Sequence, residues 1–312
     1  MTSAVVFAYH NVGVRCLRVL LARGIRMSLV VTHRDSPQEN IWFGSVAQTA
    51  AEHEIPCIVP DDPNLPETVA RIGALQPDFI FSFYYRSMLK APLLAIPPRG
   101  ALNMHGSLLP RYRGRVPVNW AIVHGETETG ATLHYMTEKP DNGDIVAQMA
   151  VPILPDDTAS EVFDKVTVAG EVTLYDALPA LINGTAPRIR QDLSKGGYFG
   201  GRKPEDGRID WTLPATQIHN LVRAVAPPYP GAFSDTNAGR LVVERTRVID
   251  ATAANAAGLR LYLRDGRLIA GCGTGTLQIL AGTLDGVSLE ADAFCERFPD
   301  AILLHDAREV RD

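Results

Sequence analysis

The chain has 312 residues, a formal net charge of −5, and 46% hydrophobic and 21% charged residues. This length can bury a large core in one or two domains, and the composition is ordinary for a globular protein. The acidic balance argues against a broad nucleic-acid-binding surface, and no apolar run is long enough to cross a membrane. The start of the chain lacks a signal-peptide pattern, so we expect a cytoplasmic protein without membrane insertion. Four widely spaced cysteines show no metal-ligand spacing, and no metal is expected.

The first part of the chain alternates between strand and helix patterns. Strands are predicted at 4–10, 27–33, 56–59, 79–84, 101–105 and 131–136, and helices at 13–23, 44–53, 66–75 and 160–182. The run 79–84 is almost wholly apolar, as expected for a strand that is buried on both faces. This alternation predicts an α/β fold with a Rossmann-like, doubly wound, mostly parallel sheet. The segment Tyr9–Gly13 lacks a G-x-G-x-x-G pattern, which argues against a dinucleotide site.

The last third of the chain changes character. Residues 184–207 are rich in glycine and basic residues and are interpreted as a crossing segment. A helix is predicted at 215–226, and the Pro227-Pro228 pair ends it. Short β-prone runs at 240–248, 260–263, 268–272 and 277–280 then alternate with glycine-containing turns, which indicates a small β-barrel. We therefore expect one domain over residues 1–200 and a second over 201–312, consisting of a linker helix and the barrel.

The strand at 101–105 carries the first candidate catalytic residues. Side chains alternate along a strand, so Asn103 and His105 lie on one face, at the carboxyl end where α/β sheets bind ligands. Imidazole is suited to proton transfer near neutral pH, and an amide N–H can stabilise a developing oxyanion. The pairing suggests acyl-type transfer. Taken in isolation, however, an Asn-x-His pattern at a strand end is more often a pair of polar side chains that form hydrogen bonds with the neighbouring backbone.

Asp141 is the third candidate. It lies in a turn-rich loop, Lys139-Pro140-Asp141-Asn142-Gly143, directly after the predicted strand 131–136. A carboxylate beside His105 would orient the imidazole ring and raise its pKa. The same Pro-Asp-Asn-Gly run also favours an Asx-turn, in which Asp141 bonds only to its own backbone. The local pattern does not choose between the two interpretations.

The wider segment resembles a known family. Residues 103–114, Asn-Met-His-Gly-Ser-Leu-Leu-Pro-Arg-Tyr-Arg-Gly, with Asp141 and Gly143 after them, resemble the signature of the 10-formyltetrahydrofolate-dependent formyltransferases. The likeness extends over nearly the whole chain and is strongest to the sugar-nucleotide branch. Within that branch the arabinose-specific (ArnA-type) formyltransferase domains are the most similar. The segments that carry the likeness to this branch are 7–10, 81–86, 119–120, 125–130, 223–225 and 230–233.

The resemblance implies roles for particular residues. Asn103, His105 and Asp141 would be catalytic, and the C-terminal barrel would be OB-like. Two loops would hold the folate co-substrate, Ser87-Met88-Leu89 on one side and Thr137-Glu138-Lys139-Pro140-Asp141 on the other. Arg115, with Tyr9 and Asn119, would contact the sugar nucleotide.

The implied reaction moves a formyl group from 10-formyltetrahydrofolate to the amine of UDP-4-amino-4-deoxy-L-arabinose. This reaction belongs to lipid A modification and polymyxin resistance. Whether His105 acts first as base or as acid stays open. In the bifunctional ArnA-type protein a decarboxylase domain follows, so we expect a homo-oligomer or association with a separate decarboxylase.

Two other functions are compatible with parts of this pattern. Methionyl-tRNA formyltransferase has the same catalytic signature but needs a surface that binds a polyanion, which this acidic chain offers little of. A non-catalytic folate- or sugar-nucleotide-binding module would not require Asn103, His105 and Asp141 together.

Overall fold

The computed structural model describes residues 1–312 except 38, 255–257, 293, 295–297, 299–300 and 305–312. The chain divides into two compact units, which are described one at a time. The first unit comprises Met1–Pro117, Glu128–Pro152 and Phe163–Gly200. The second comprises Val118–Thr127, Ile153–Val162 and Gly201–Asp312. No helix in the described ranges is long and apolar enough to cross a membrane.

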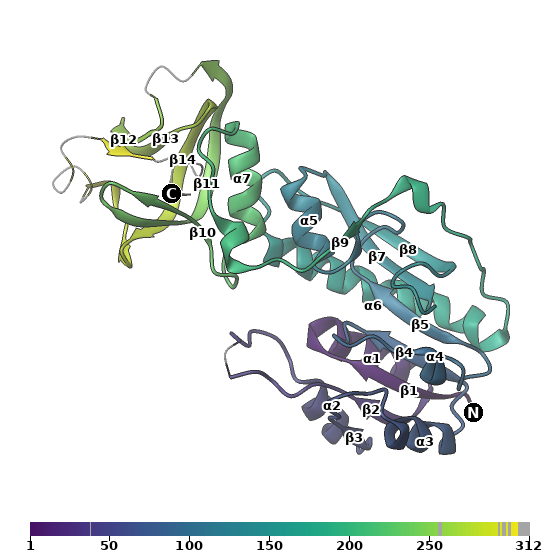
Figure 1. The fold of residues 1–312 in the computed structure, drawn as a ribbon. Helices are drawn as coiled ribbons and strands as arrows, with labels where there is room; N and C mark the ends of the chain where they lie inside the picture. Colours follow the sequence, from purple (N-terminus) through teal and green to yellow (C-terminus); the bar gives the residue numbers. More distant parts are fainter. Residues whose placement is uncertain (38, 255–257, 293, 295–297, 299–300, 305–312) are drawn as a thin grey trace. The chain divides into compact units, whose positions relative to one another are not determined.

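The first unit is built on one mixed sheet with the strand order β3-β2-β1-β4-β5-β7-β8 (Figure 1). The strands are β1 (Ser3–Ala8), β2 (Arg26–Val31), β3 (Cys57–Ile58), β4 (Phe79–Phe83), β5 (Ala101–His105), β7 (Glu128–Tyr135) and β8 (Ile145–Pro152). Strands β1 to β5 run parallel, whereas β7 is antiparallel to both β5 and β8. Every residue of β1 and β4 is buried, which explains their continuous apolar runs. The predicted α/β sheet is confirmed.

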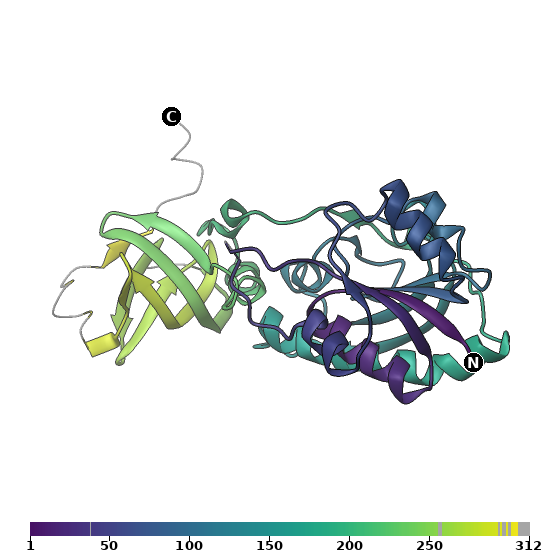
Figure 2. The same cartoon turned by 90° about the horizontal axis from the view of Figure 1, so that it is seen from below.

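Helices cover both faces of this sheet. They are α1 (His10–Ala22), α2 (Val46–Glu52), α3 (Pro66–Ala74), α4 (Ala91–Leu94) and α6 (Ala159–Asn183). Helix α5 (Pro117–Val123) belongs to the second unit from Val118 on. In Figure 2, α1 and α6 lie on one face and α3 and α4 on the other. A Cβ atom on Gly170 of α6 would lie 3.4 Å from Met104 Cγ, so the even positions of β5 pack on α6. Asn103 and His105 therefore face away from α6.

The predicted boundaries differ from the structure at several elements, and the end of the first strand is one of them. The first strand ends at Ala8 rather than at His10, because Tyr9 caps α1 and accepts a hydrogen bond from the Gly13 N–H through its carbonyl. His10 then opens the helix with a left-handed φ of 66°. Strand β8 was not predicted. In this edge strand Ile145 and Val146 are buried, and from residue 147 on intermediate and exposed positions alternate.

The second unit is an antiparallel, barrel-like sheet with helix α7 (Ala215–Ala224) packed against it. Its strands are β10 (Ala232–Thr236), β11 (Gly239–Ala254), β12 (Arg260–Arg264), β13 (Arg267–Gly271), β14 (Thr274–Leu284), β15 (Val287–Ser288) and β16 (Ile302–Leu303). The order is β10-β11-β14-β13-β12-β16, and a bridge between Thr236 and Leu304 joins the two edges (Figure 2). Trp211 is fully buried in the core of this unit. The predicted smaller β-barrel is confirmed.

The crossing segment carries short regular pieces: η1 (Leu193–Lys195), β9 (Tyr198–Phe199) and η2 (Pro204–Gly207). Strand β9 pairs in parallel with β6 (Arg113–Gly114), which follows the turn after β5. Gly114 has a φ of 99°, and a Cβ atom on it would lie 2.2 Å from the carbonyl oxygen of Phe199. Only glycine therefore fits at this position. The pairing fixes the chain around the candidate catalytic loop.

Candidate active site

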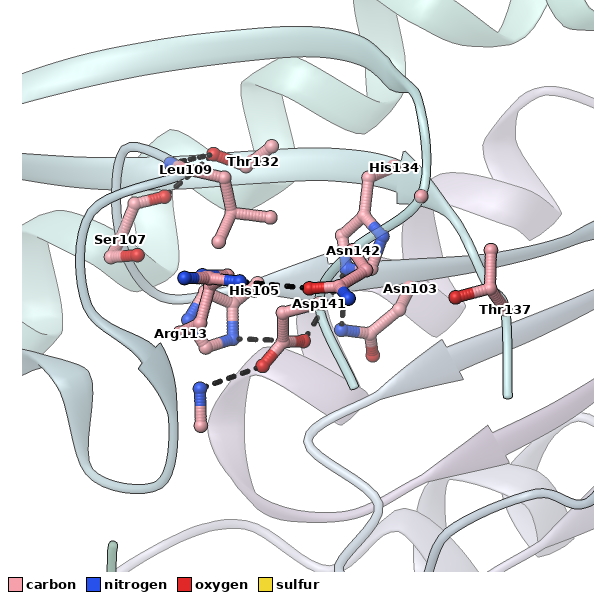
Figure 3. Close-up of polar contacts among 12 residues, drawn as sticks. Asn103, His105, Ser107, Leu109, Arg113, Thr132, His134, Thr137, Asp141 and Asn142 are labelled. Atoms are coloured by element: carbon pink, nitrogen blue, oxygen red, sulfur yellow. Dashed lines mark hydrogen bonds and ion pairs between the residues drawn. The ribbon is translucent and has the colours of Figure 1, made fainter. Parts of the chain in front are cut away.

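Asn103 and His105 lie at the end of β5 with their side chains on the same face (Figure 3). The antiparallel register places Asn103 opposite His134 and His105 opposite Thr132 on β7. His105 is 6% exposed. Its Nε2 lies 2.8 Å from the carbonyl oxygen of Tyr112. Because a carbonyl oxygen only accepts hydrogen bonds, this contact places a proton on Nε2.

Asp141 faces His105 from the loop between β7 and β8. Its Oδ1 lies 3.5 Å from His105 Nδ1, and its Oδ2 accepts a 2.8 Å hydrogen bond from the main-chain N–H of Gly114. Burial alone would raise the pKa of Asp141, but the two nearby imidazole rings and the main-chain N–H outweigh it. The pKa of this carboxyl is therefore held well below its usual range. An ionised Asp141 therefore faces the Nδ1 edge of the His105 ring.

The loop that carries Asp141 is held in an unusual conformation. Asp141 has a left-handed φ of 54°, and a Cβ atom on Gly143 would lie 1.8 Å from the carbonyl oxygen of Tyr135. Gln191 Nε2 donates to the carbonyl oxygens of Asp141 and Gly143 at 2.9 and 2.7 Å. Arg113 Nη1 donates to the Asn142 side-chain oxygen at 3.0 Å. Side chains from β6 and the crossing segment thus position the Asp141 carboxylate.

His134 is part of the same cluster, although sequence reasoning missed it. Its side chain is 2% exposed, and its Nε2 lies 3.2 Å from Asn103 Nδ2 and 3.5 Å from Asp141 Oδ1. The strand 131–136 was predicted, and alternation alone puts Thr132 and His134 on one face. The missing information was that this strand pairs with β5, and in which register.

The two predicted folate loops form the walls of one cavity of about 560 Å³. It is lined by Met88, Leu89, Lys90, Ala91, Pro92, Glu138, Pro140 and Tyr198. Ser87, Thr137, Lys139 and Asp141 belong to the same two loops but are not among the lining residues. Tyr198, from β9, is a lining residue that the sequence did not indicate. The cavity is large enough for a ring system of cofactor size.

The residues predicted to contact a sugar nucleotide have different environments. Tyr9 is 4% exposed and donates a 2.7 Å hydrogen bond to Asp35, beside a separate cavity of about 220 Å³. Arg115 has an exposed side chain in the loop after β6. In the second unit, Asn119 is 5% exposed and donates a 2.7 Å hydrogen bond to the Ala224 carbonyl. The substrate roles of these residues stay predictions.

His10, beside Tyr9, lies in an aromatic cluster. Its ring centroid is 4.7 Å from that of Trp42, 3.9 Å from Phe43 and 4.7 Å from Phe163. Burial lowers the pKa of His10 to about 4, so the ring is neutral at physiological pH. These are the contacts of a packing residue. In the part of the chain that the structure describes, no group of three or more His, Cys, Asp or Glu side chains could hold a metal ion.

Two family models cover most of the chain. The model described as formyl transferase matches residues 22–178, and the model described as formyl transferase, C-terminal domain, matches residues 202–299. The chain belongs to the formyl transferase family. The Asn103–His105–Asp141 cluster of this formyltransferase lies within the first matched range.

Solved structures share the fold of this formyltransferase. An N-formyltransferase from Helicobacter canadensis, in complex with folinic acid and dTDP-3-aminofucose, matches 89% of this chain and 99% of its own at 19% identity, with a TM-score of 0.70. WlaRD, a sugar 3N-formyl transferase, matches 89% and 97% at 18% identity, with a TM-score of 0.70. A 4-N formyltransferase from Francisella tularensis matches 74% and 91% at 20% identity, with a TM-score of 0.61.

Proposed function

We propose that this formyltransferase moves the formyl group of 10-formyltetrahydrofolate to the primary amine of a nucleotide-linked amino sugar. The observation that carries the proposal is the Asn103–His105–Asp141 cluster. Asp141 lies on the same loop as Glu138 and Pro140, which line the 560 Å³ cavity. That cavity would hold the folate, with its formyl group presented to the amide and the imidazole. The folate carries the one-carbon unit, and the protein residues handle the charge and the proton.

The chemistry follows from the groups at the site. The amine nitrogen attacks the formyl carbon, and the carbonyl oxygen becomes an oxyanion. An N–H of the Asn103 amide would donate to that oxyanion, because a fixed donor stabilises charge that develops in the transition state. The bond between the carbon and N10 of the folate then breaks. One proton leaves the amine and one reaches N10, giving a formamide and tetrahydrofolate.

His105 would carry this proton. Its Nε2 side is bonded to Tyr112, and its Nδ1 side faces Asp141, so the ring gains stabilisation at both nitrogens when it is doubly protonated. General acid–base catalysis by such a ring is suited to neutral pH. Asp141 would act by stabilising the charged ring. It has no direct role on the substrate in this scheme.

The proposed acceptor is an amino sugar on a nucleoside diphosphate. Two of the structures with the same fold are described as sugar formyltransferases or hold a dTDP-amino sugar, and a third is a 4-N formyltransferase. Within this class we propose UDP-4-amino-4-deoxy-L-arabinose, because the segments around Tyr9, Tyr84 and Asn119 resemble the arabinose-specific branch. Arg115 is exposed and suits a diphosphate oxygen. A separate decarboxylase acting on the same sugar nucleotide would be a partner of this enzyme.

The test is a direct assay with purified protein and 10-formyltetrahydrofolate. The acceptors are UDP-4-amino-4-deoxy-L-arabinose, dTDP-linked 3-amino and 4-amino sugars, and initiator Met-tRNA. We expect formylation of the arabinose substrate with the highest kcat/KM, and no formylation of the tRNA. A higher kcat/KM for a dTDP-sugar would contradict the arabinose assignment alone. Formylation of the tRNA but of no sugar would contradict the whole proposal.

A further inference from the structure

Asn103 and His134 face each other across two neighbouring strands. They are direct partners in the antiparallel register of β5 and β7, so their side chains project from the same face of the sheet (Figure 3). The distance from Asn103 Nδ2 to His134 Nε2 is 3.2 Å. The His134 side chain is 2% exposed, so this contact is sheltered from water.

The hydrogen bond at the other nitrogen determines which group donates. His134 Nδ1 lies 2.8 Å from the carbonyl oxygen of Tyr135. A carbonyl oxygen only accepts, so Nδ1 carries a hydrogen. In the neutral ring Nε2 then has a free lone pair, and the attraction between His134 and Asp141 described above belongs to the doubly protonated ring. The amide nitrogen of Asn103 has only hydrogens to offer, and it therefore donates to Nε2.

This bond restrains a side chain that would otherwise turn. The terminal torsion of asparagine is broad, so strand position alone does not fix the plane of the amide. Donation to His134 uses one N–H of Asn103 and fixes the direction of the other N–H and of Oδ1. A hydrogen-bond donor stabilises an oxyanion only when it points at the place where the charge develops.

We propose that His134 is a positioning residue for formyl transfer, acting through Asn103. Its unprotonated Nε2 holds the amide so that the second N–H of Asn103 faces the formyl oxygen. The proposal rests on the function proposed above, because it needs Asn103 to be the oxyanion donor. Asp141 Oδ1 is 3.5 Å from His134 Nε2, so a ring protonated at that nitrogen would donate to Asp141 and release Asn103.

Two variants of His134 separate the two bonds of the ring. The His134→Gln side chain places an oxygen near the position of Nε2 and can still accept from Asn103. The His134→Asn side chain places an N–H near the position of Nδ1 and keeps the bond to Tyr135, but it does not reach Asn103. We expect His134→Asn to lower kcat about 10²-fold, the usual cost of an oxyanion donor, and His134→Gln to keep kcat within about tenfold of wild type. Neither variant should change the KM for the folate donor appreciably.

A double-mutant cycle shows whether the effect passes through Asn103. Adding His134→Asn to an Asn103→Ala background should leave kcat where Asn103→Ala alone puts it, since the group to be positioned is gone. An undiminished loss in that background would overturn the proposal, as would equal activity of the two His134 variants. If the wild-type enzyme formylates no amino sugar, that result contradicts the proposed function, and the role of His134 is then tested by the tautomer measurement that follows.

The tautomer of His134 can be measured without any turnover. Selective ¹⁵N-histidine labelling of the full chain, with His134→Gln to assign the resonance, reports which ring nitrogen carries the proton. We expect His134 to carry its proton at Nδ1 and not at Nε2, and a changed Nε2 shift in Asn103→Ala. A ring protonated at Nε2 in wild-type protein would overturn the proposal, even if the enzyme is an active sugar formyltransferase.

Discussion

The side-chain amide of Gln191 donates a 2.9 Å hydrogen bond to the main-chain carbonyl of Asp141, fifty residues earlier in the chain. The same nitrogen also donates to the carbonyl of Gly143 at 2.7 Å. Gln191 is 8% exposed, so these two carbonyl groups have little access to water as an alternative partner. One buried amide therefore holds the loop that carries the Asp141 carboxylate.

Replacing this amide should damage both the fold and the activity. Gln191→Leu keeps a similar volume but leaves two sheltered carbonyl groups without their donor, at a cost of about 1–3 kcal/mol for each unsatisfied group. We expect a lower free energy of unfolding in urea and a lower kcat, because Asp141 loses its fixed position. The control is Gln48→Leu, since the amide of Gln48 bonds only at the exposed surface, to Glu52. Equal stabilities of the two variants would contradict the role of Gln191.

Removing the imidazole of His105 should abolish turnover. His105→Ala eliminates the group that moves the proton, which costs about 10²–10⁴-fold in kcat. His105→Gln is a second test, because its amide can still donate to the Tyr112 carbonyl without titrating. We expect both variants to bind folate, measured by calorimetry, and both to be inactive, while His53→Ala at an exposed position stays active. A wild-type kcat in His105→Gln would remove proton transfer by His105 from the mechanism.

Neutralising Asp141 should lower activity and change how stability depends on pH. Asp141→Asn no longer stabilises the charged His105 ring, so we expect kcat to fall on the order of 10²–10⁴-fold. The pKa of Asp141 is lowered in the folded protein, so its contribution to stability is complete above the unfolded pKa of about 3.9 and is lost as the pH falls further.

The measurement is urea unfolding of wild type and Asp141→Asn at several pH values. The stability advantage of the wild type should be full near pH 7 and should shrink below about pH 4. Asp164→Asn, at an exposed position on α6, controls for the general effect of losing a charge. If the stability advantage of the wild type grew as the pH fell, folding would raise the pKa of Asp141 and not lower it.

Binding of the nucleotide sugar should weaken with salt if Arg115 contacts its diphosphate. Ions screen an exposed charge pair over a Debye length of about 10 Å at 0.1 M. We expect calorimetry to give a Kd that rises with ionic strength, and a shallower rise for Arg115→Gln. Arg26→Gln, at the opposite end of the sheet from the carboxyl strand ends, should keep the wild-type slope. Parallel slopes for wild type and Arg115→Gln would exclude Arg115 as a phosphate contact.

Local pattern predicted most of the regular structure. The buried strands β1 and β4 were recognisable because a strand covered on both faces is apolar at nearly every position. Strand β8 was not predicted, although seven of its eight residues, all but Gln148, are apolar or proline. The end of β1 was misplaced because Tyr9 and His10 are aromatic residues suited to a strand, whereas the structure uses them to begin α1.

The sequence by itself determined the fold class, because apolar periodicity is a local property. It indicated Asn103, His105 and Asp141 through the resemblance of residues 103–114 to the formyltransferase signature, and not through spacing alone. Only the tertiary structure decided that Asp141 faces His105 instead of closing an Asx-turn. It also decided that His134 lies opposite Asn103, thirty-one residues away, and that Gln191 reaches the loop from the crossing segment. These contacts depend on which strands are neighbours and in what register. A periodic pattern specifies which face of a strand is buried, but it does not specify the partner strand.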